Sequence, residues 1–183
     1  MSPIVSASPV RTARIAGAFY LITFIVGFTA LLGSGRLQFV ANVIGDLAYL
    51  AVTVLFYGLF KPVNKTVSLV AALFSLAGIV SGLSSLFNLP HLPINNVVVF
   101  GLYCLSIGYL VLESTFLPHV LGVLMMIAGL GWLTFLFPSL AASLRPYNMA
   151  PGIIGEAALM IWLLVVGVNA ARWTAQASFA RTR

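Results

Sequence analysis

The chain has 183 residues, of which 61% are hydrophobic and only 7% are charged. Soluble domains carry about 25% charged residues, so this composition excludes a soluble globular protein. The net charge is +6, from nine Lys and Arg against three acids. The basic residues gather near the ends of apolar runs and form no continuous basic stripe, so a nucleic-acid partner is not expected.

The apolar runs predict an all-α, polytopic membrane bundle that forms a single domain. A spanning helix needs about 20 mainly apolar residues, and unpaired backbone groups exclude open sheets from hydrocarbon. The runs lack the alternation of barrel strands. We therefore expect six transmembrane helices, at about residues 15–32, 39–60, 67–89, 97–112, 120–137 and 152–171.

The first apolar run follows Arg11 and Arg14. A basic start before an apolar core is also typical of a signal peptide. This core is long for that role, and no convincing small-residue cleavage site follows it. We expect the segment to be retained as the first span.

Small residues mark faces on which helices can pack closely. In the third span they recur at intervals of three and four residues, which places them on one side of a helix: Ala71, Ser75, Gly78, Gly82 and Ser85. Gly101 and Gly108 lie along one side of the fourth span, and Gly122 and Gly129 mark a face of the fifth. Such faces allow close helix–helix approach. The face of the third span is also compatible with a homo-oligomer.

The distribution of basic residues predicts the orientation. With both termini inside, the inner segments hold Arg11, Arg14, Lys61, Lys65, Arg172, Arg181 and Arg183, and the outer loops hold only Arg36 and Arg145. The positive-inside rule therefore favours an N-in, C-in protein of the inner (plasma) membrane. A cytoplasmic interface follows from this orientation and comprises Lys61, Lys65, Glu113 and His119.

Two acids lie inside the predicted spans and are the candidates for a functional site. Asp46 is about 10 Å and Glu156 about 6 Å from the outer ends of their helices, at about 1.5 Å per residue. A charge at the bilayer centre costs about 2.5–3.5 kcal/mol on insertion scales, and less near the interface. We expect an outward-facing polar cavity that binds a cation, a proton or a basic group, with Arg145 and His91 as further candidates.

Structural roles for these acids remain open. If the second helix starts near Gly45, Asp46 is a first-turn acid, and Glu156 also lies near a helix start, where the dipole favours an acid. Each carboxylate can also accept hydrogen bonds from a neighbouring helix. A zinc site formed by His91, Asp46 and Glu156 is a weaker alternative because no paired ligand spacing supports it. We therefore expect no metal and no cofactor.

Catalytic motifs are absent: the sequence contains no H-E-x-x-H, no G-x-S-x-G and no P-loop. We expect a non-enzymatic membrane protein that binds or transports a small cation or polar solute through its outer-leaflet acids. The alternative is an interaction or structural protein that docks a partner or lipids. An intramembrane acid–base or metal enzyme is the weakest hypothesis.

Three stretches resemble one family of bacterial membrane proteins. They are LFYGLFKPVNK, FGLYCLSIGYLVLESTFLPHVLGVLMMIAGLGWL and PYNMAPGIIGEAALMIWLLVVGVNAARW. The family is the domain of unknown function 4386, and the resemblance implies a six-helix inner-membrane protein without implying a reaction or substrate. The chain departs from the family in a short first outer loop and in His119, which stands where an Arg is expected.

Overall fold

The computed structural model describes residues 8–90 and 95–181, and within them all regular structure is helical. The helices are α1 (Pro9–Leu32), α2 (Gly35–Phe60), α3 (Lys65–Leu86), α4 (Asn96–Glu113), α5 (His119–Leu133), α6 (Pro138–Leu144), α7 (Ala150–Val165) and α8 (Ala170–Arg181), with a 3-10 turn (Thr134–Leu136) after α5. The predicted all-α class is confirmed.

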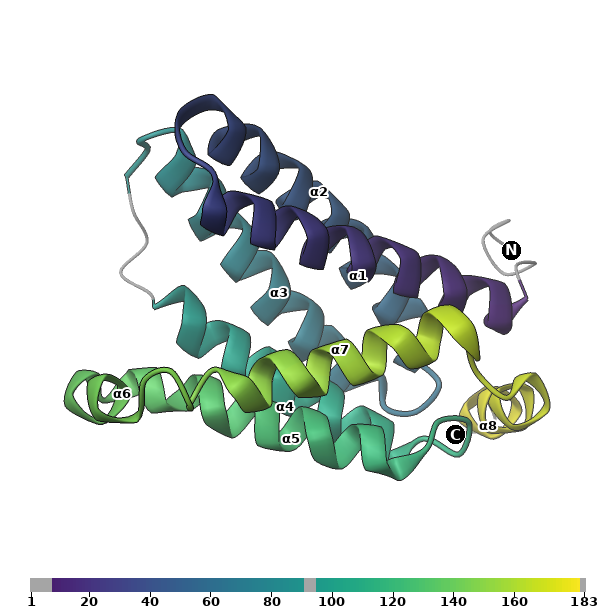
Figure 1. Ribbon diagram of the computed structural model, residues 1–183. Coiled ribbons are helices and arrows are strands. Elements are labelled where there is room, and N and C mark those ends of the chain that lie inside the picture. The colour runs from purple at the N-terminus through teal and green to yellow at the C-terminus, as the bar shows by residue number, and fades with distance from the viewer. Residues whose placement is uncertain (1–7, 91–94, 182–183) are drawn as a thin grey trace.

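Six long helices form a closed ring in sequence order (Figure 1). Each of α1, α2, α3, α4 and α5 packs against the next long helix of the chain, and α7 packs against both α5 and α1. Short connections favour antiparallel neighbours, which explains this order. The short helix α6 lies at one end of the ring and α8 at the other (Figure 1).

Five helices are long and apolar enough to cross a membrane, or up to six if the bent pair α7–α8 counts as one. Helix α7 alone has 16 residues and measures roughly 24 Å, less than the ~30 Å hydrocarbon core. It ends at Val165, before the predicted end of the sixth span, because Gly167 adopts a positive φ of 79° that favours glycine. The chain then turns by 103° into α8.

Helix α8 begins near the predicted end of the sixth span and is hydrogen-bonded across one end of the ring. The Trp173 indole N–H donates to the Leu59 carbonyl at 2.9 Å. Gln176 accepts from the Thr115 backbone N–H at 3.0 Å and donates to the Glu113 carbonyl at 3.2 Å. These bonds satisfy backbone groups at the ends of α2 and α4, where helices leave them unpaired. The expected outer loop at 138–151 likewise contains a helix, α6.

The core fills only the half of the ring near α8. Its buried side chains come from the N-terminal half of α1, the C-terminal halves of α2, α4 and α7, and the start of α5, and include Ala16, Phe60, Ile107, Met125 and Leu163. The opposite half of the ring is hollow, as described below. The two ends of the bundle therefore differ in packing.

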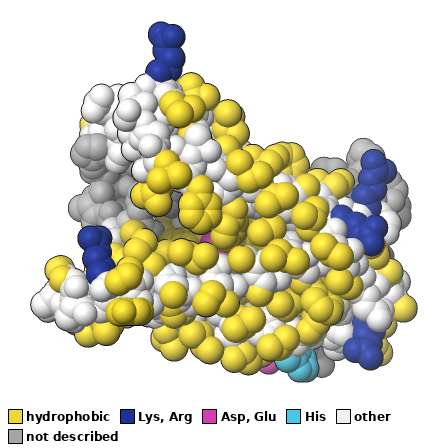
Figure 2. All heavy atoms as spheres, in the orientation of Figure 1, with side chains coloured by type: hydrophobic (Ala, Val, Ile, Leu, Met, Phe, Trp, Pro, Cys, Tyr) yellow, Lys and Arg dark blue, Asp and Glu magenta, His cyan; other side chains and the backbone are white. Residues whose placement is uncertain are grey.

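The two ends also differ in charge. Exposed basic residues on segments at the α8 end are Arg11, Arg14, Lys61, Lys65 and Arg172, whereas Arg36 and Arg145 are exposed on segments at the other end (Figure 1). Figure 2 shows Lys and Arg side chains at the ends of the molecule and hydrophobic side chains between them. The basic residues that the sequence analysis assigned to opposite sides therefore lie at opposite ends of the bundle.

The glycines of α4 and α5 face each other. A Cβ atom on Gly101 would lie 3.0 Å from the Gly129 carbonyl oxygen, and one on Gly129 would lie 2.8 Å from the Gly101 oxygen. Gly108 and Gly122 form an equivalent pair, with distances of 3.0 and 2.9 Å. The predicted close-packing faces are therefore confirmed, and they pack against each other.

A glycine substitution tests this packing. We expect Gly108→Ala to destabilise the protein by about 1–3 kcal/mol, because its Cβ would lie 2.9 Å from the Met126 backbone nitrogen. Gly58→Ala is the matched control, since a Cβ there meets nothing within 4 Å. Thermal unfolding in detergent compares the two. Equal stability of both variants would contradict the close packing of α4 on α5.

Candidate functional site

A cavity of about 570 Å³ occupies the hollow half of the ring. All six long helices contribute to its lining, and the residues come from the halves that lie away from α8. Figure 2 shows the corresponding hollow on one face, with hydrophobic side chains around it and an acidic side chain inside. The cavity is therefore formed by all six helices of the ring together.

Both acids predicted as site residues line this cavity. Helix α2 begins at Gly35 and has no acid in its first turn, so Asp46 lies in the middle of a helix and the first-turn interpretation is wrong. Helix α7 begins at Ala150, and Glu156 also lies beyond its first turn. The helix dipole falls off within the first turn and therefore explains neither position.

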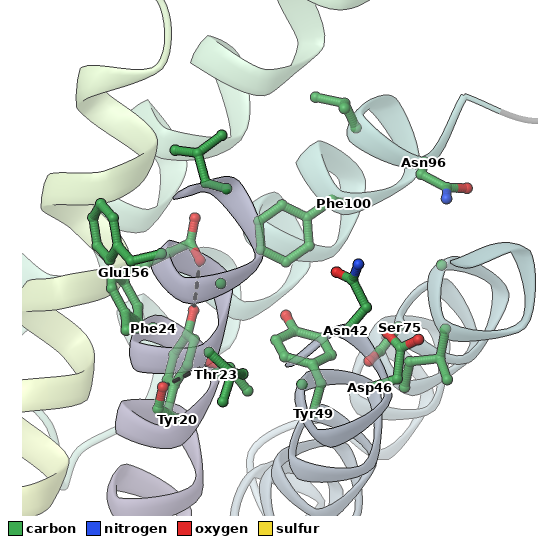
Figure 3. A pocket seen from close by; sticks show the side chains of 18 of the residues that line it. Tyr20, Thr23, Phe24, Asn42, Asp46, Tyr49, Ser75, Asn96, Phe100 and Glu156 are labelled. Carbon is green, nitrogen blue, oxygen red and sulfur yellow. Dashed lines mark hydrogen bonds between the residues drawn. The ribbon is translucent and has the colours of Figure 1, made fainter. Parts of the chain in front are cut away.

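Glu156 is buried and accepts two hydrogen bonds. The Tyr20 hydroxyl donates to its Oε2 and the Trp132 indole N–H donates to its Oε1, both at 3.1 Å (Figure 3 draws the Tyr20 bond). The three residues belong to α7, α1 and the end of α5. The interpretation of Glu156 as a carboxylate that accepts hydrogen bonds from neighbouring helices is correct, and it connects three members of the ring.

Asp46, unlike Glu156, has no hydrogen-bond partner among the described residues. It is half-buried, and its carboxylate has no hydrogen bond or ion pair to any residue that the structure describes. It lies against Gly82 of α3, where a Cβ would be 3.4 Å from the nearer carboxylate oxygen. In Figure 3 its carboxylate lies on the cavity wall on the same helix as Asn42, which precedes it by one turn. Asp46 is thus an acid without a counter-charge among the described residues.

A second cavity of about 470 Å³ also reaches Asp46. It is lined by residues at the start of α2, including Gln38 and Asn42, and by Gly82 and Ser85 near the end of α3. Asp46 and Asn42 line both cavities. The carboxylate therefore lies where the large cavity and this polar groove between α2 and α3 meet.

Aromatic side chains from five helices form much of the wall of the large cavity: Tyr20, Phe24, Phe28, Tyr49, Phe74, Phe100 and Trp132. Several pack edge-to-face, such as Tyr20 on Tyr49 with ring centroids 6.2 Å apart. Asn96 also lines the cavity, and its buried side-chain oxygen has no hydrogen-bond partner. The sequence analysis did not predict these residues, because their spacing in the sequence does not indicate that side chains from five different helices meet.

The other predicted residues lie elsewhere. Arg145 is exposed at the end of α6 and is not part of the cavity lining, and His91 lies outside the described residues. The predicted interface residues are all exposed at the α8 end: Lys61, Lys65, Glu113 and His119. Within the described part of the chain, no ion pair joins Glu113 to the basic residues expected beside it.

The described residues contain no group of three His, Cys, Asp or Glu side chains that would hold a metal ion. The zinc alternative depended on His91, which the structure does not describe. Among the described side chains, the chemistry of the cavity is that of two carboxylates, several amide and hydroxyl groups and an aromatic wall.

Residues 94–167 match the family described as a domain of unknown function (DUF4386). The resemblance to this family is confirmed. The match includes Glu156, Trp132, Phe100 and Asn96, while Asp46 and Tyr20 precede it. The cavity is therefore built partly from the DUF4386 segment and partly from the preceding helices.

An uncharacterized protein of Archaeoglobus fulgidus is 26% identical to the chain over 125 residues. The alignment covers 63% of this chain and 75% of that protein. No solved structure matches the chain. The comparisons identify a DUF4386 segment and assign no activity.

Removing the Tyr20 hydroxyl tests the Glu156 network. We expect Tyr20→Phe to lower the free energy of unfolding by about 1–3 kcal/mol, because a buried carboxylate oxygen loses its donor. Tyr147→Phe is the control, since Tyr147 is exposed at the α6 end. A thermal-unfolding series in detergent gives both values. If Tyr20→Phe is as stable as Tyr147→Phe, the hydrogen bond from Tyr20 to Glu156 does not stabilise the packing of α1 against α7.

Proposed function

We propose that the protein binds a small positively charged ligand in the large cavity, with Asp46 as its principal anionic contact. The single observation that carries the proposal is the unpaired Asp46 carboxylate on the wall of a cavity of about 570 Å³. An unpaired charge within a membrane bundle is costly, so such residues are functional candidates. A cationic group in the cavity removes this cost.

Glu156 supports the same charge preference. No Lys or Arg is among the described residues that line the cavity, although two acids are. Both oxygens of Glu156 already accept hydrogen bonds, so we assign it the roles of holding the wall together and of making the cavity more negative. Asp46 is left as the group that a ligand contacts directly.

The proposed setting is the inner (plasma) membrane of a bacterial cell, with the α8 end in the cytoplasm. The exposed basic residues at that end support this orientation through the positive-inside rule. The cavity then lies in the outer half of the membrane. The packed core between the cavity and the α8 end favours binding or sensing, since transport would require this core to open.

A second candidate is a non-catalytic structural or interaction protein. The observation in its favour is Glu156, whose two hydrogen bonds join three helices without any ligand. Ala71 and Ser75 of the small-residue face of α3 are buried within the chain, and Gly82 contacts Asp46. These residues pack within the chain, which favours an intramolecular role for that part of the face. Neither candidate requires enzymatic activity.

Asp46→Asn tests the proposal by ligand-induced stabilisation. The purified protein is heated in detergent with sodium, potassium, magnesium, calcium, alkylammonium and arylphosphonium salts. A ligand that binds only the folded state at 100 times its Kd adds about 2.7 kcal/mol of stability. We expect at least one cation to stabilise the natural protein and to lose its effect in Asp46→Asn.

Glu113→Gln is the matched control because Glu113 is the third acid and is exposed at the opposite end of the bundle. It should respond to cations like the natural protein. If no cation stabilises either protein, or if Asp46→Asn responds unchanged, binding at Asp46 is excluded and the structural candidate gains support.

A further inference from the structure

We propose that the ligand is an amphiphilic organic cation, with an aromatic or alkyl body and a quaternary or protonated head, that enters from the lipid between α1 and α7. This inference rests on the proposed function and names its class of ligand. Four features of the cavity carry it: its aromatic wall, its shortage of free oxygen ligands, its volume and its apolar rim.

The wall suits an organic cation. Ring faces and edges from Phe24 of α1, Tyr49 of α2, Phe74 of α3 and Phe100 of α4 line the same space as the two carboxylates. Aromatic rings attract cations through their negative faces, most effectively when water is excluded, and aromatic cages are a known means of binding quaternary ammonium groups. The same rings supply apolar surface for the body of the ligand.

The wall suits an inorganic cation poorly. Calcium takes six to eight oxygen ligands. Several oxygens near the cavity are already engaged: the Ser75 hydroxyl is hydrogen-bonded to Thr53, the Thr23 hydroxyl donates to the Tyr20 carbonyl, and Glu156 accepts two bonds. Besides the Asp46 carboxylate, the described lining offers the Asn42 and Asn96 amide oxygens and the Tyr49 hydroxyl, which are fewer oxygens than calcium needs to replace its hydration shell. A weakly hydrated organic cation needs no such replacement.

The volume agrees with this class. A cavity of about 570 Å³ lies within the roughly 300–1,000 Å³ range of sites for drug-sized molecules. A bare metal ion would leave most of this space to water between apolar walls. A ligand with two or more rings or alkyl arms fills it.

The entrance faces lipid. Helices α1 and α7 touch near the α8 end, where a Cβ on Gly17 would lie 2.5 Å from the Leu164 nitrogen, and they diverge toward the other end (Figure 1). The cavity residues on the diverging segments are exposed and apolar: Phe28, Leu31, Met149 and Ile153. Figure 2 shows hydrophobic side chains around the hollow. An apolar rim admits a molecule that partitions into the membrane.

The test uses tetraphenylphosphonium as the probe and neutral triphenylphosphine oxide as its control of similar shape. Titration calorimetry of the full chain in detergent compares the natural protein with Asp46→Asn, Phe74→Leu, Glu113→Gln and Phe137→Leu. Phe74 lines the cavity, whereas Phe137 is an exposed phenylalanine outside its lining.

We expect the phosphonium to bind far more tightly than the neutral oxide. Asp46→Asn should weaken binding by about tenfold or more, in line with the loss of a charge pair in a site of low dielectric. Phe74→Leu should weaken it by roughly threefold, as expected for one cation–π contact. Glu113→Gln and Phe137→Leu should leave the affinity unchanged.

The failure of this inference is distinguishable from that of the proposed function. Inorganic cations that bind through Asp46 while the phosphonium does not bind would leave the proposed function standing and overturn the ligand class. Equal binding of the charged and neutral compounds, or no effect of Phe74→Leu, would also overturn it. No binding of any cation would overturn both.

The entrance has its own test. Gly27 is exposed on α1 and lines the cavity, and a Cβ added to it would meet nothing within 4 Å, so Gly27→Leu should fold and partly block the opening. Gly58→Leu is the control, because Gly58 is equally unobstructed and lies away from the cavity. In lipid nanodiscs we expect Gly27→Leu alone to slow phosphonium association. Equal association rates would place the entrance elsewhere.

Discussion

A carboxylate surrounded by hydrocarbon must accept hydrogen bonds or pair with a cation, and this constraint shapes the closure of the ring. Helix α7 is the last long helix of the chain and closes the ring by packing against α1, and Glu156 lies at that closure. Tyr20 and Trp132 supply the two donors that the carboxylate needs. Because the donors belong to α1 and to the end of α5, satisfying one buried acid also sets the position of three helices.

Packing then divides the ring into two halves. Toward α8, large side chains such as Phe60, Ile107 and Leu163 fill the centre, and Gly17 lets α1 touch the backbone of α7. Toward the other end, the same helices separate and leave a cavity lined by aromatic rings and two acids. The bundle is therefore closely packed at the end where α8 is hydrogen-bonded to it, and it contains a cavity at the end where the proposed ligand would enter.

Glu156 and Asp46 differ in their hydrogen bonds, and this difference is the basis of the proposed function. Two acids share a cavity, but only one has its hydrogen bonds satisfied within the described residues. A protein selected for stability alone gains nothing from the second. The proposed organic cation would pair with Asp46 and pack on the aromatic wall, and it would also account for the volume and the apolar rim of the cavity.

The sequence by itself determined the class of protein. Long apolar runs without the alternation of barrel strands are compatible only with helices in a bilayer, so the all-α class and most helix positions followed from composition. The seven-residue glycine spacings of α4 and α5 also identified close-packing faces correctly, because glycine at such intervals lies on one helix face. The positions of Asp46 and Glu156 inside apolar runs were also visible in the sequence, because acids are rare in such runs.

Only the tertiary structure decided how these parts combine. The turn at Gly167 shortens α7 because a single backbone conformation, and not hydrophobicity, ends that helix. The partners of Glu156 are 136 and 24 residues away in the sequence, so no local pattern could reveal them. The aromatic wall draws on five helices for the same reason. Local patterns determine which segments form apolar helices, whereas the packing of those helices into a ring decides which side chains meet inside it.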